Sequence, residues 1–385
     1  MARSGVRMVR FIHSADWQIG MSRHFLSPEA QSRYSEARLE AIRRIAELAA
    51  RESCDFAVVA GDVFESNQLD RQVVARALDA LAAFEVPVFL LPGNHDPLLS
   101  AGSLWDSQSF LARCPANVVV LRDDRPLAVP GCPAEVVGAL WRTKRPVEDL
   151  VARALSALEP ARTVRVLVGH GSIDEQSPDP GNPALINLRS AEQAIADGRV
   201  HYVALGDRHS VTEVGSTGRI WYSGTPLVTD YDEVEPNRAL LVSLSPEGCA
   251  VERLDVGDWA FRRQRFELSG LDDVEEVGRW LEELPDKRRC VVKASFVGTV
   301  SLAARLRLDK VLDEHRDLLA ALEVSDRRTD LAVLPSDEEI GDLGLGGFVA
   351  ATLEELKDLA GAQDEGAATA QDALALLFRL AGGGS

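Results

Sequence analysis

Short apolar runs that end in polar, metal-competent residues recur along the first half of the chain. Residues 86–91 form one such run, which leads through Pro92 and Gly93 into the polar segment 94–96, Asn-His-Asp. Four other runs end in the same way, at Asp16 with Gln18, at Asp62, at His170, and at Asp207 with His209. In an α/β fold, a strand end followed by a glycine turn presents ligands at the carboxyl edge of the sheet. Packing alone does not account for five such runs.

The segments between the first runs have the apolar spacing of helices. A β-α-β-α-β beginning indicates a central sheet with helices on its faces. The pattern predicts strands over 6–12, 56–60, 86–91, 164–168, 200–205, 220–222 and 239–244, with short ones near Val118, Leu127 and Val136. It predicts helices over 28–51, 69–84, 104–112, 146–158 and 191–196.

A second region opens near Phe261 and has the pattern of a small α+β module. Its predicted elements are a strand over 261–268, a helix over 274–284, a strand over 290–296 and a helical run over 300–322. From Ser336 the composition turns acidic, with ten acidic residues against the single base Lys357 between positions 337 and 372. Residues 361–370 read as a flexible linker between amphipathic segments at 353–359 and 373–380. The expected domains are therefore 1–258, 259–335 and a tail over 336–385.

The composition is that of a soluble globular protein, with 385 residues of which 46% are hydrophobic and 26% charged. A formal net charge of −18 disfavours unaided binding to a polyphosphate. It leaves a nucleic-acid substrate possible, because bound cations or a basic partner can supply the missing charge. The five cysteines include no C-x-x-C pair, and we expect a reducing cytoplasm, with no signal peptide and no membrane span.

Carboxylates, amide oxygens and imidazoles together form a mixed oxygen and nitrogen ligand set. Such a set suits Mn²⁺, Fe²⁺ or Zn²⁺ better than Ca²⁺ or a thiolate-bound metal. Two metals that act on a phosphoryl group need one shared carboxylate, and Asp62 on the second strand is the natural bridge. A water between the ions would be the nucleophile. His95 is better placed to face the substrate and protonate the leaving oxygen.

These motifs resemble those of the calcineurin-like metallophosphoesterases, and within them the nuclease subunit of the SbcCD type, whose relatives process DNA double-strand breaks. The resemblance covers roughly residues 8–245. It rests on Asp16-x-Gln18, Gly61-Asp62, Gly93-Asn94-His95-Asp96, Gly169-His170, Gly206-Asp207-x-His209 and Tyr222-Ser223-Gly224-Thr225-Pro226. It implies an α/β fold, a four-layer sandwich of two sheets flanked by helices, with a small C-terminal α+β capping domain.

The resemblance also implies roles for individual residues. The first metal would be held by Asp16, Gln18, Asp62 and His209, and the second by Asp62, Asn94, His170 and Asp207. His95 would be the catalytic histidine. The family mostly has histidine at the positions of Gln18 and Asp207. Both replacements still coordinate, and they favour Mn²⁺ or Mg²⁺ over Zn²⁺, with Fe²⁺ possible; the alternative is a weakened site that has lost one metal.

Partners follow from the same resemblance. In the family, the C-terminal helices bind the coiled-coil base of an ABC-type ATPase, the SbcC-like subunit, and the apolar segment 373–380 is the candidate here. The other interpretation of this segment is that it packs on its own chain. The family is commonly dimeric, and residues 30–51 and 104–112 could serve that contact. The expected substrate is DNA.

Several further residues have two interpretations. His13 is expected to be a buried, hydrogen-bonded residue behind the ligands, and Asp96 to orient its loop or His95. Arg208, between two ligands, is a candidate contact for a substrate phosphate. The basic clusters 142–145 and 262–265 either follow a phosphate backbone or form solvated faces, and Trp17 either stacks on a base or packs.

The sequence thus predicts a metal-dependent DNA nuclease, a hydrolase of the phosphodiesterase or exonuclease type, in an SbcCD-like repair complex. One rival is a phosphodiesterase or phosphatase that acts on small nucleotides, which the acidic charge favours. The other is a catalytically weakened scaffold, for which Gln18 and Asp207 are the support.

Overall fold

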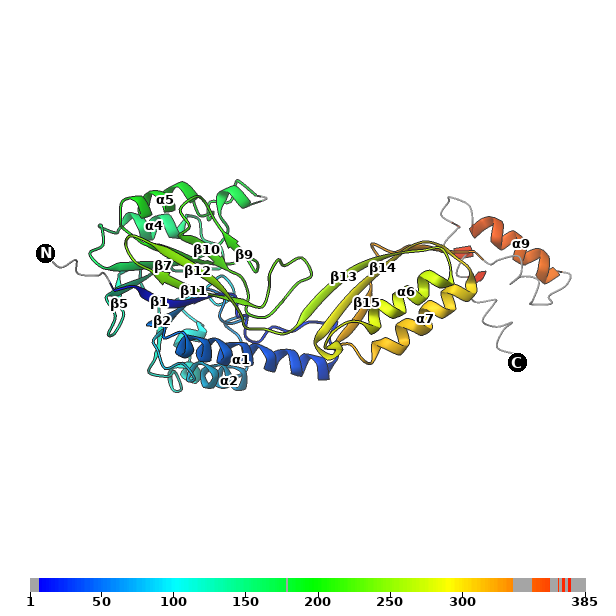
Figure 1. Cartoon of the computed structure of the whole chain (residues 1–385), viewed down its shortest axis with the longest axis horizontal. Coiled ribbons are helices and arrows are strands. Elements are labelled where there is room, and N and C mark those ends of the chain that lie inside the picture. Colours follow the sequence, from blue (N-terminus) through cyan, green and yellow to red (C-terminus); the bar gives the residue numbers. More distant parts are fainter. Residues whose placement is uncertain are drawn as a thin grey trace. The chain divides into compact units, whose positions relative to one another are not determined.

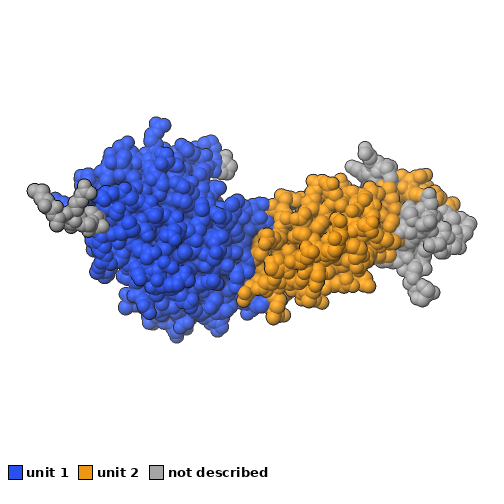
Figure 2. Space-filling view, in the orientation of Figure 1, with its two compact units in different colours: residues 1–23, 31–259 blue, residues 24–30, 260–385 orange. Residues whose placement is uncertain are grey.

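The computed structural model describes residues 7–177, 179–334, 348–360, 366, 369–370 and 373–374. The chain divides into two compact units, which are coloured separately in Figure 2. The first comprises residues 1–23 and 31–259, and the second comprises residues 24–30 and 260–385. The first unit carries all the motifs of the candidate site. Within the described ranges, every helix is too short or too polar to cross a bilayer.

The first unit contains two six-stranded sheets, and the first of them has the order β12-β11-β1-β2-β3-β4. Strands β1 to β4 are parallel, and β1, β2 and β3 are almost wholly buried, as expected for strands covered on both faces. Two antiparallel strands, β11 and β12, extend the sheet beyond β1. The bounds are β1 Val9–Ser14, β2 Phe56–Ala60, β3 Val88–Leu91, β4 Val118–Val120, β11 Arg238–Leu244 and β12 Cys249–Asp255.

The second sheet has the order β5-β6-β7-β8-β10-β9, with β6, β7, β8 and β10 parallel. Its strands are β5 Leu127–Ala128, β6 Ala134–Gly138, β7 Val164–His170, β8 Tyr202–Gly206, β9 Val211–Glu213 and β10 Ile220–Ser223. One apolar core lies between the two sheets and draws side chains from both. Phe11 of β1 stacks on Phe56 of β2 at 4.8 Å between ring centroids and meets Tyr202 of β8 edge-on at 5.5 Å.

Helices cover the outer face of each sheet, which gives four layers (Figure 1). The first sheet is covered by α1 Pro28–Arg51, α2 Arg71–Leu81, the 3₁₀ turn η1 Leu104–Asp106 and α3 Gln108–Leu111. The second is covered by α4 Leu150–Ser156 and α5 Leu188–Ala196, and a short turn, η2 Asp174–Gln176, follows β7. The predicted fold class, an α/β arrangement of two sheets flanked by helices, is therefore confirmed.

The second unit is a separate α/β module with its own apolar core. Its strands are parallel, and α6 and α7 pack on the strands and on each other. Its elements are β13 Ala260–Leu268, α6 Leu271–Glu282, η3 Lys287–Arg289, β14 Cys290–Val300, α7 Leu302–Arg316, β15 Ala321–Val324, β16 Asp330–Val333 and α9 Phe348–Ala360.

Two predicted helices were wrong in extent. The run over 300–322 is a helix only to Arg316, and Ala321–Val324 forms β15, which pairs with β14. Alanine and leucine favour a helix locally, but pairing with a buried neighbouring strand overrides that preference. The run over 104–112 is broken at Ser107, whose side chain accepts a hydrogen bond from the Phe110 amide and begins a new helix there.

The described part of the tail packs on the second unit. Ala360, Ala370 and Leu374 are buried and belong to its core, and Leu374 is only 1% exposed. These contacts favour the interpretation in which the segment packs on its own chain. Most of the expected linker, 361–370, and of the apolar segment, 373–380, lies outside the described residues.

Candidate metal centre

The predicted ligands follow the carboxyl ends of five strands. Strands β1, β2 and β3 are neighbours in the first sheet, and β7 and β8 are neighbours in the second. Asp16, Asp62 and Asn94 follow the first three strands, His170 closes β7, and Asp207 follows β8. Hydrogen bonds from backbone to side chain link the two sheets at this edge, because Asp207 N donates to both carboxylate oxygens of Asp16 at 3.1 Å. The structure therefore brings the two halves of the ligand set together.

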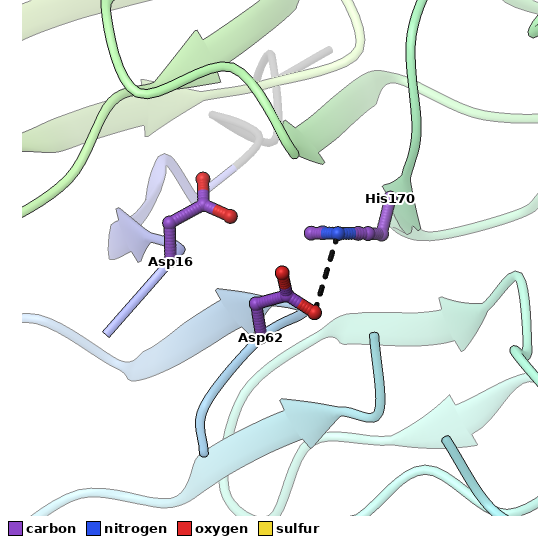
Figure 3. Close-up of side chains that lie close together, drawn as sticks. All are labelled: Asp16, Asp62 and His170. Carbon is purple, nitrogen blue, oxygen red and sulfur yellow. Dashed lines mark ion pairs between the residues drawn. The ribbon is translucent and has the colours of Figure 1, made fainter. Parts of the chain in front are cut away.

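Asp16, Asp62 and His170 form the centre of the group (Figure 3). Each offers one ligand atom, and these atoms lie within 4.8 Å of one another. All three residues are buried. Asp62 is close to His170, with Oδ1 3.5 Å from His170 Nε2, and the sequence predicts it to be the shared carboxylate.

His170 presents one ring nitrogen to the group. Its Nδ1 donates to the Ala60 carbonyl at 2.8 Å, so Nε2 is the nitrogen that faces the other predicted ligands. Nε2 lies 2.7 Å from Asn94 Oδ1, 3.5 Å from Asp62 Oδ1 and 3.8 Å from Asp207 Oδ1. These are the four residues expected to hold the second metal, and they are collected around a single imidazole nitrogen.

The backbone at the predicted ligands is strained. Among the described residues other than glycine, eight have positive φ, and four of these are Asp16 (52°), Gln18 (44°), Asp62 (50°) and Asp207 (94°). Non-glycine residues adopt this conformation at a cost, and it persists where surrounding structure enforces it. In addition, Gln18 Oε1 is buried without a hydrogen-bond partner. A buried acceptor without a hydrogen-bond partner is available to a cation.

Two glycines allow the side chains to approach. A Cβ on Gly61, where φ is +91°, would lie 2.2 Å from His170 Nδ1. A Cβ on Gly93 would lie 2.2 Å from Asp62 Oδ1 and 2.4 Å from Asp62 N. Any larger residue at either position would displace a predicted ligand.

The shifted pKa values of the buried residues also indicate that the centre is suited to positive charge. Burial raises the pKa of Asp16 to about 7, although His209 and His170 act to lower it. Burial also acts to raise the pKa of Asp62, but His170 and His95 together lower it below its usual value. Burial acts to lower the pKa of His170, yet Asp62, Asp16 and Asp207 raise it well above its usual value. Closely spaced carboxylates in a buried site are stabilised by cations, so the residues present fit divalent metal ions.

His95 lies at the open side of the group and is 36% exposed. Its backbone amide donates to Asp62 Oδ1 at 2.9 Å, which links it directly to a predicted ligand. Its Nδ1 donates to the Glu65 carbonyl at 3.1 Å and leaves Nε2 free, 3.8 Å from Asp62 Oδ2. This nitrogen is accessible to a group that enters from solvent.

The sequence analysis missed two partners of His209. Nδ1 of His209 lies 2.7 Å from the Thr229 hydroxyl and 3.0 Å from Glu233 Oε1. Burial acts to lower the pKa of His209, but the hydrogen bond to Glu233 and the charge of Asp16 raise it. The acidic run 230–233, which is separated from the Tyr222–Pro226 motif by three residues, was the available signal, and its spacing from His209 gave no indication of contact.

Three other residues can now be placed. His13 is fully buried, between the Tyr202 hydroxyl at 3.1 Å and the Leu205 carbonyl at 3.2 Å. Asp96 accepts hydrogen bonds from the amides of Gly93 (2.7 Å) and Phe64 (2.9 Å) and so fixes the loop that carries Asn94 and His95. Trp17 is 1% exposed and donates to the Ser14 hydroxyl, so it packs in the core and the base-stacking interpretation is wrong.

A cleft of about 340 Å³ adjoins the centre. Asp207, Arg208 and His209 line it together with Tyr222 and acidic residues of the 230–233 loop. Arg208 is exposed, and its guanidinium is held by Thr212 Oγ1 at 2.9 Å and Gln176 Oε1 at 3.2 Å. The predicted phosphate contact therefore lies at the rim of the site rather than within it. The basic segment 142–145 is mostly exposed, which leaves both of its interpretations open.

Comparison with known proteins matches residues 9–211 to the calcineurin-like phosphoesterase family. The chain belongs to the calcineurin-like phosphoesterase family. Members of this family hydrolyse phosphoester bonds and use divalent metals, so the chain is a hydrolase that acts on phosphoester bonds. The buried Asp16, Asp62 and His170 are a group that could bind metal in this phosphoesterase.

Among curated proteins, the phosphoesterase is similar to the DNA double-strand break repair protein Mre11 of Archaeoglobus fulgidus. The two are 30% identical over 183 residues, which is 43% of this chain and 39% of the relative. The match thus spans less than half of the relative's length.

Two solved structures are similar at lower identity. The protein TT1561 of Thermus thermophilus is 11% identical, with a TM-score of 0.40 over 65% of this chain and 100% of that one. Purple acid phosphatase PPD1 of yellow lupin is 12% identical, with a TM-score of 0.37 over 65% of this chain and 52% of that one.

Proposed function

We propose that the chain is a DNA nuclease, which hydrolyses phosphodiester bonds at a centre of two divalent cations. The observation that carries the proposal is the convergence of the strand ends on Asp62, with carboxylate, amide and imidazole ligands on both sides of it. The similarity to a double-strand break repair protein supports DNA as the substrate class. The proposed catalytic unit is residues 1–258.

The predicted ligands of the site would form two groups, one for each ion. Asp16, Gln18, Asp62 and His209 would hold one ion, and Asp62, Asn94, His170 and Asp207 would hold the other. The oxygen-rich set favours Mn²⁺, with Mg²⁺ and Fe²⁺ as possible occupants. When bound, such a pair of ions acidifies a water and polarises the phosphoryl group.

The remaining steps belong to side chains of the protein. His95 donates a hydrogen bond from Nδ1 to the Glu65 carbonyl, and in the doubly protonated imidazolium its Nε2 carries a second proton that it would donate to the leaving oxygen, which leaves the ring neutral. Asp96 keeps the His95 loop in place through two backbone amides. Arg208, at the rim of the cleft, would orient the phosphate that follows or precedes the scissile one.

Partner molecules would supply the positive charge that the chain lacks for DNA binding. With a net charge of −18, the chain needs cations or a basic surface from elsewhere to hold a polyphosphate. We propose an SbcC-like ABC-type ATPase as the main partner, bound through the tail over 336–385, and a capping role for residues 259–335. A homodimer through 30–51 and 104–112 is proposed as well.

The test of the nuclease assignment is hydrolysis by the full chain with added Mn²⁺. Linear double-stranded DNA and a small chromogenic phosphodiester are compared at equal enzyme concentration, and elemental analysis counts the bound metal. Two ions per chain and efficient cleavage of DNA are expected. Cleavage of the small diester alone would favour the rival, an enzyme of small nucleotides, which the acidic lining of the cleft supports. Fewer than two ions and no cleavage of either substrate would leave the scaffold interpretation.

The partner proposal is tested by co-purification with an SbcC-like ATPase. A chain that ends at position 361 should lose the ATPase while it retains Mn²⁺-dependent hydrolysis of the small diester. The thermal midpoint of the second unit must be measured in parallel, because Ala370 and Leu374 belong to its core. Retained co-purification would contradict the assignment of the tail.

A further inference from the structure

Glu233 is a buried carboxylate beside one of the predicted metal ligands. Its side chain is 5% exposed, and its Oε1 lies 3.0 Å from His209 Nδ1. A carboxylate can only accept, so Nδ1 of His209 carries the proton and Nε2 is left free for an ion. The tautomer of His209 is thus fixed by a residue that lies 24 positions away in the sequence.

Other donors in the same loop hold the Glu233 carboxylate in place. The Thr229 amide donates to Oε2 at 2.9 Å, and the Asp230 amide donates to Oε1 at 3.1 Å. The Thr229 hydroxyl also donates to Oε1 and accepts from His209 Nδ1 at 2.7 Å. With these partners the carboxylate cannot rotate away without losing several hydrogen bonds, two of them to backbone amides.

The loop itself is anchored to the first unit. Arg23 donates to the Thr229 carbonyl, and the Tyr34 hydroxyl donates to the neighbouring Val228 carbonyl at 2.6 Å. Because the anchors act on backbone atoms, the position of Glu233 relative to His209 does not depend on an exposed side chain. The orientation of the imidazole is therefore built into the fold.

We propose that Glu233 is the positioning residue for His209 and sets how tightly the centre holds the ion that His209 shares with Asp16, Gln18 and Asp62. The inference rests on the proposed two-ion centre. A carboxylate on the far nitrogen fixes the ring of a ligating histidine and makes it a stronger electron donor, and loss of such a partner typically weakens metal binding 10- to 100-fold.

The test measures Mn²⁺ binding to the full chain by titration with electron paramagnetic resonance of the free ion. The unmodified chain should bind two ions. Glu233→Ala should weaken one of the two sites about 10- to 100-fold and leave the other unchanged. Glu233→Gln should lie in between, because its amide oxygen still accepts from Nδ1 but carries no charge. Glu235→Gln is the matched control, since Glu235 is exposed and its carboxylate pairs with Arg253.

A second measurement is independent of metal. Nitrogen-15 NMR of the metal-free chain, recorded at a pH high enough for His209 to be neutral, should show its Nδ1-protonated tautomer. The double variant Thr229→Val, Glu233→Ala should show both tautomers under the same conditions. Unchanged affinity at both sites in Glu233→Ala and in Glu233→Gln would overturn the role of Glu233 while the metal centre stands. If the unmodified chain binds no Mn²⁺, the metal centre itself is overturned. Should Glu233→Ala fail to fold, the isosteric Glu233→Gln decides.

Discussion

The three histidines of the site share one arrangement at the residue scale. In His95 and His170, Nδ1 donates to a backbone carbonyl, and in His209 it is held by Thr229 and Glu233. In each case Nε2 is the nitrogen that remains available. Because the partner atoms belong to strands and anchored loops, the imidazoles are oriented before any ion or substrate arrives, which lowers the entropy lost on binding.

The role of His95 can be tested by substitution. We expect His95→Ala to lower the rate of DNA hydrolysis by about 10²- to 10⁴-fold, because a general acid contributes a factor of this size. Mn²⁺ stoichiometry should stay unchanged, since His95 is not a predicted ligand. The measurement is the turnover number at saturating Mn²⁺. His24→Ala, a histidine exposed on the surface, is the control; equal rates for the two variants would remove His95 from the mechanism.

The buried side chain of His13 leads to a prediction about how the stability of the fold depends on pH. Burial lowers the pKa of His13 to about 3, against 6.5 for the ordinary side chain. As pH falls below 6.5 the unfolded chain takes up this proton and the folded chain does not. The stability that neutral His13 contributes is therefore present above pH 6.5 and is lost toward pH 3, by about 1.4 kcal/mol per pH unit.

The free energy of unfolding of the unmodified chain is compared with that of His13→Gln, by urea denaturation at pH 6.5, 5.5 and 4.5. Burial raises the pKa of Asp16 to about 7 and of Asp96 to about 8, and these groups act in the opposite direction. They are present in both proteins, so the difference between the two isolates His13. The unmodified chain should lose stability faster than the variant as pH falls, and parallel curves would contradict the prediction.

At the scale of elements, the site depends on how strands end. The loops after β1, β2 and β8 adopt positive φ at Asp16, Asp62 and Asp207, so the chain changes direction sharply at the predicted ligands. Backbone bonds between loops, such as Asp16 N to Gly61 O at 3.1 Å, hold adjacent strand ends in register. The parallel sheet thus supplies the alignment, and the loop conformation supplies the direction of each ligand.

Gly93→Ala tests this dependence at the end of β3. The added Cβ would lie 2.2 Å from Asp62 Oδ1 and must displace the bridging carboxylate. We expect a destabilisation of about 1–3 kcal/mol, as for overpacked cores, together with loss of bound Mn²⁺. Thermal unfolding and elemental analysis measure the two effects. Gly181→Ala is the control, because its nearest neighbour would be at an ordinary 3.5 Å, and identical behaviour of the two variants would show that the loop can move away.

At the scale of the whole molecule, the C-terminal residues contribute to the core of the second unit. Leu374 is 1% exposed and packs in the cluster that contains the α6 and α7 side chains. We expect Leu374→Ala to destabilise the second unit by about 2–5 kcal/mol, the usual range for a buried leucine. Hydrogen exchange of α6 and α7 measures this without interference from the first unit.

Leu359→Ala is the matched control, because Leu359 is 44% exposed and its truncation leaves no cavity. Mn²⁺-dependent hydrolysis of a small diester should be unaffected in both variants, since every predicted ligand lies in the first unit. Equal protection of α6 and α7 in the two variants would mean that the C-terminal contact is not part of the stable core.

By itself, the sequence determined the elements that carry the site. Buried apolar runs of four to seven residues predict parallel strands, and a polar residue after each run predicts the edge of the sheet where ligands gather. The structure has strands in these runs, with Asp62 and Asn94 after two of them and His170 at the end of a third. Both signals are local, because they depend on neighbours along the chain. The sequence pattern did not predict strands β9, β12, β15 and β16. These strands are short or exposed at a sheet edge, and they gain their stability from pairing with neighbouring strands.

Only the tertiary structure decided which groups touch. Three features depend on contacts between loops. His209 contacts Glu233 through Nδ1, the His95 amide donates to Asp62, and Trp17 is buried. Such contacts have no period in the sequence, because a loop's conformation is set by the hydrogen bonds available around it. The shifted pKa values of the site residues likewise depend on burial, which cannot be read from the order of residues along the chain.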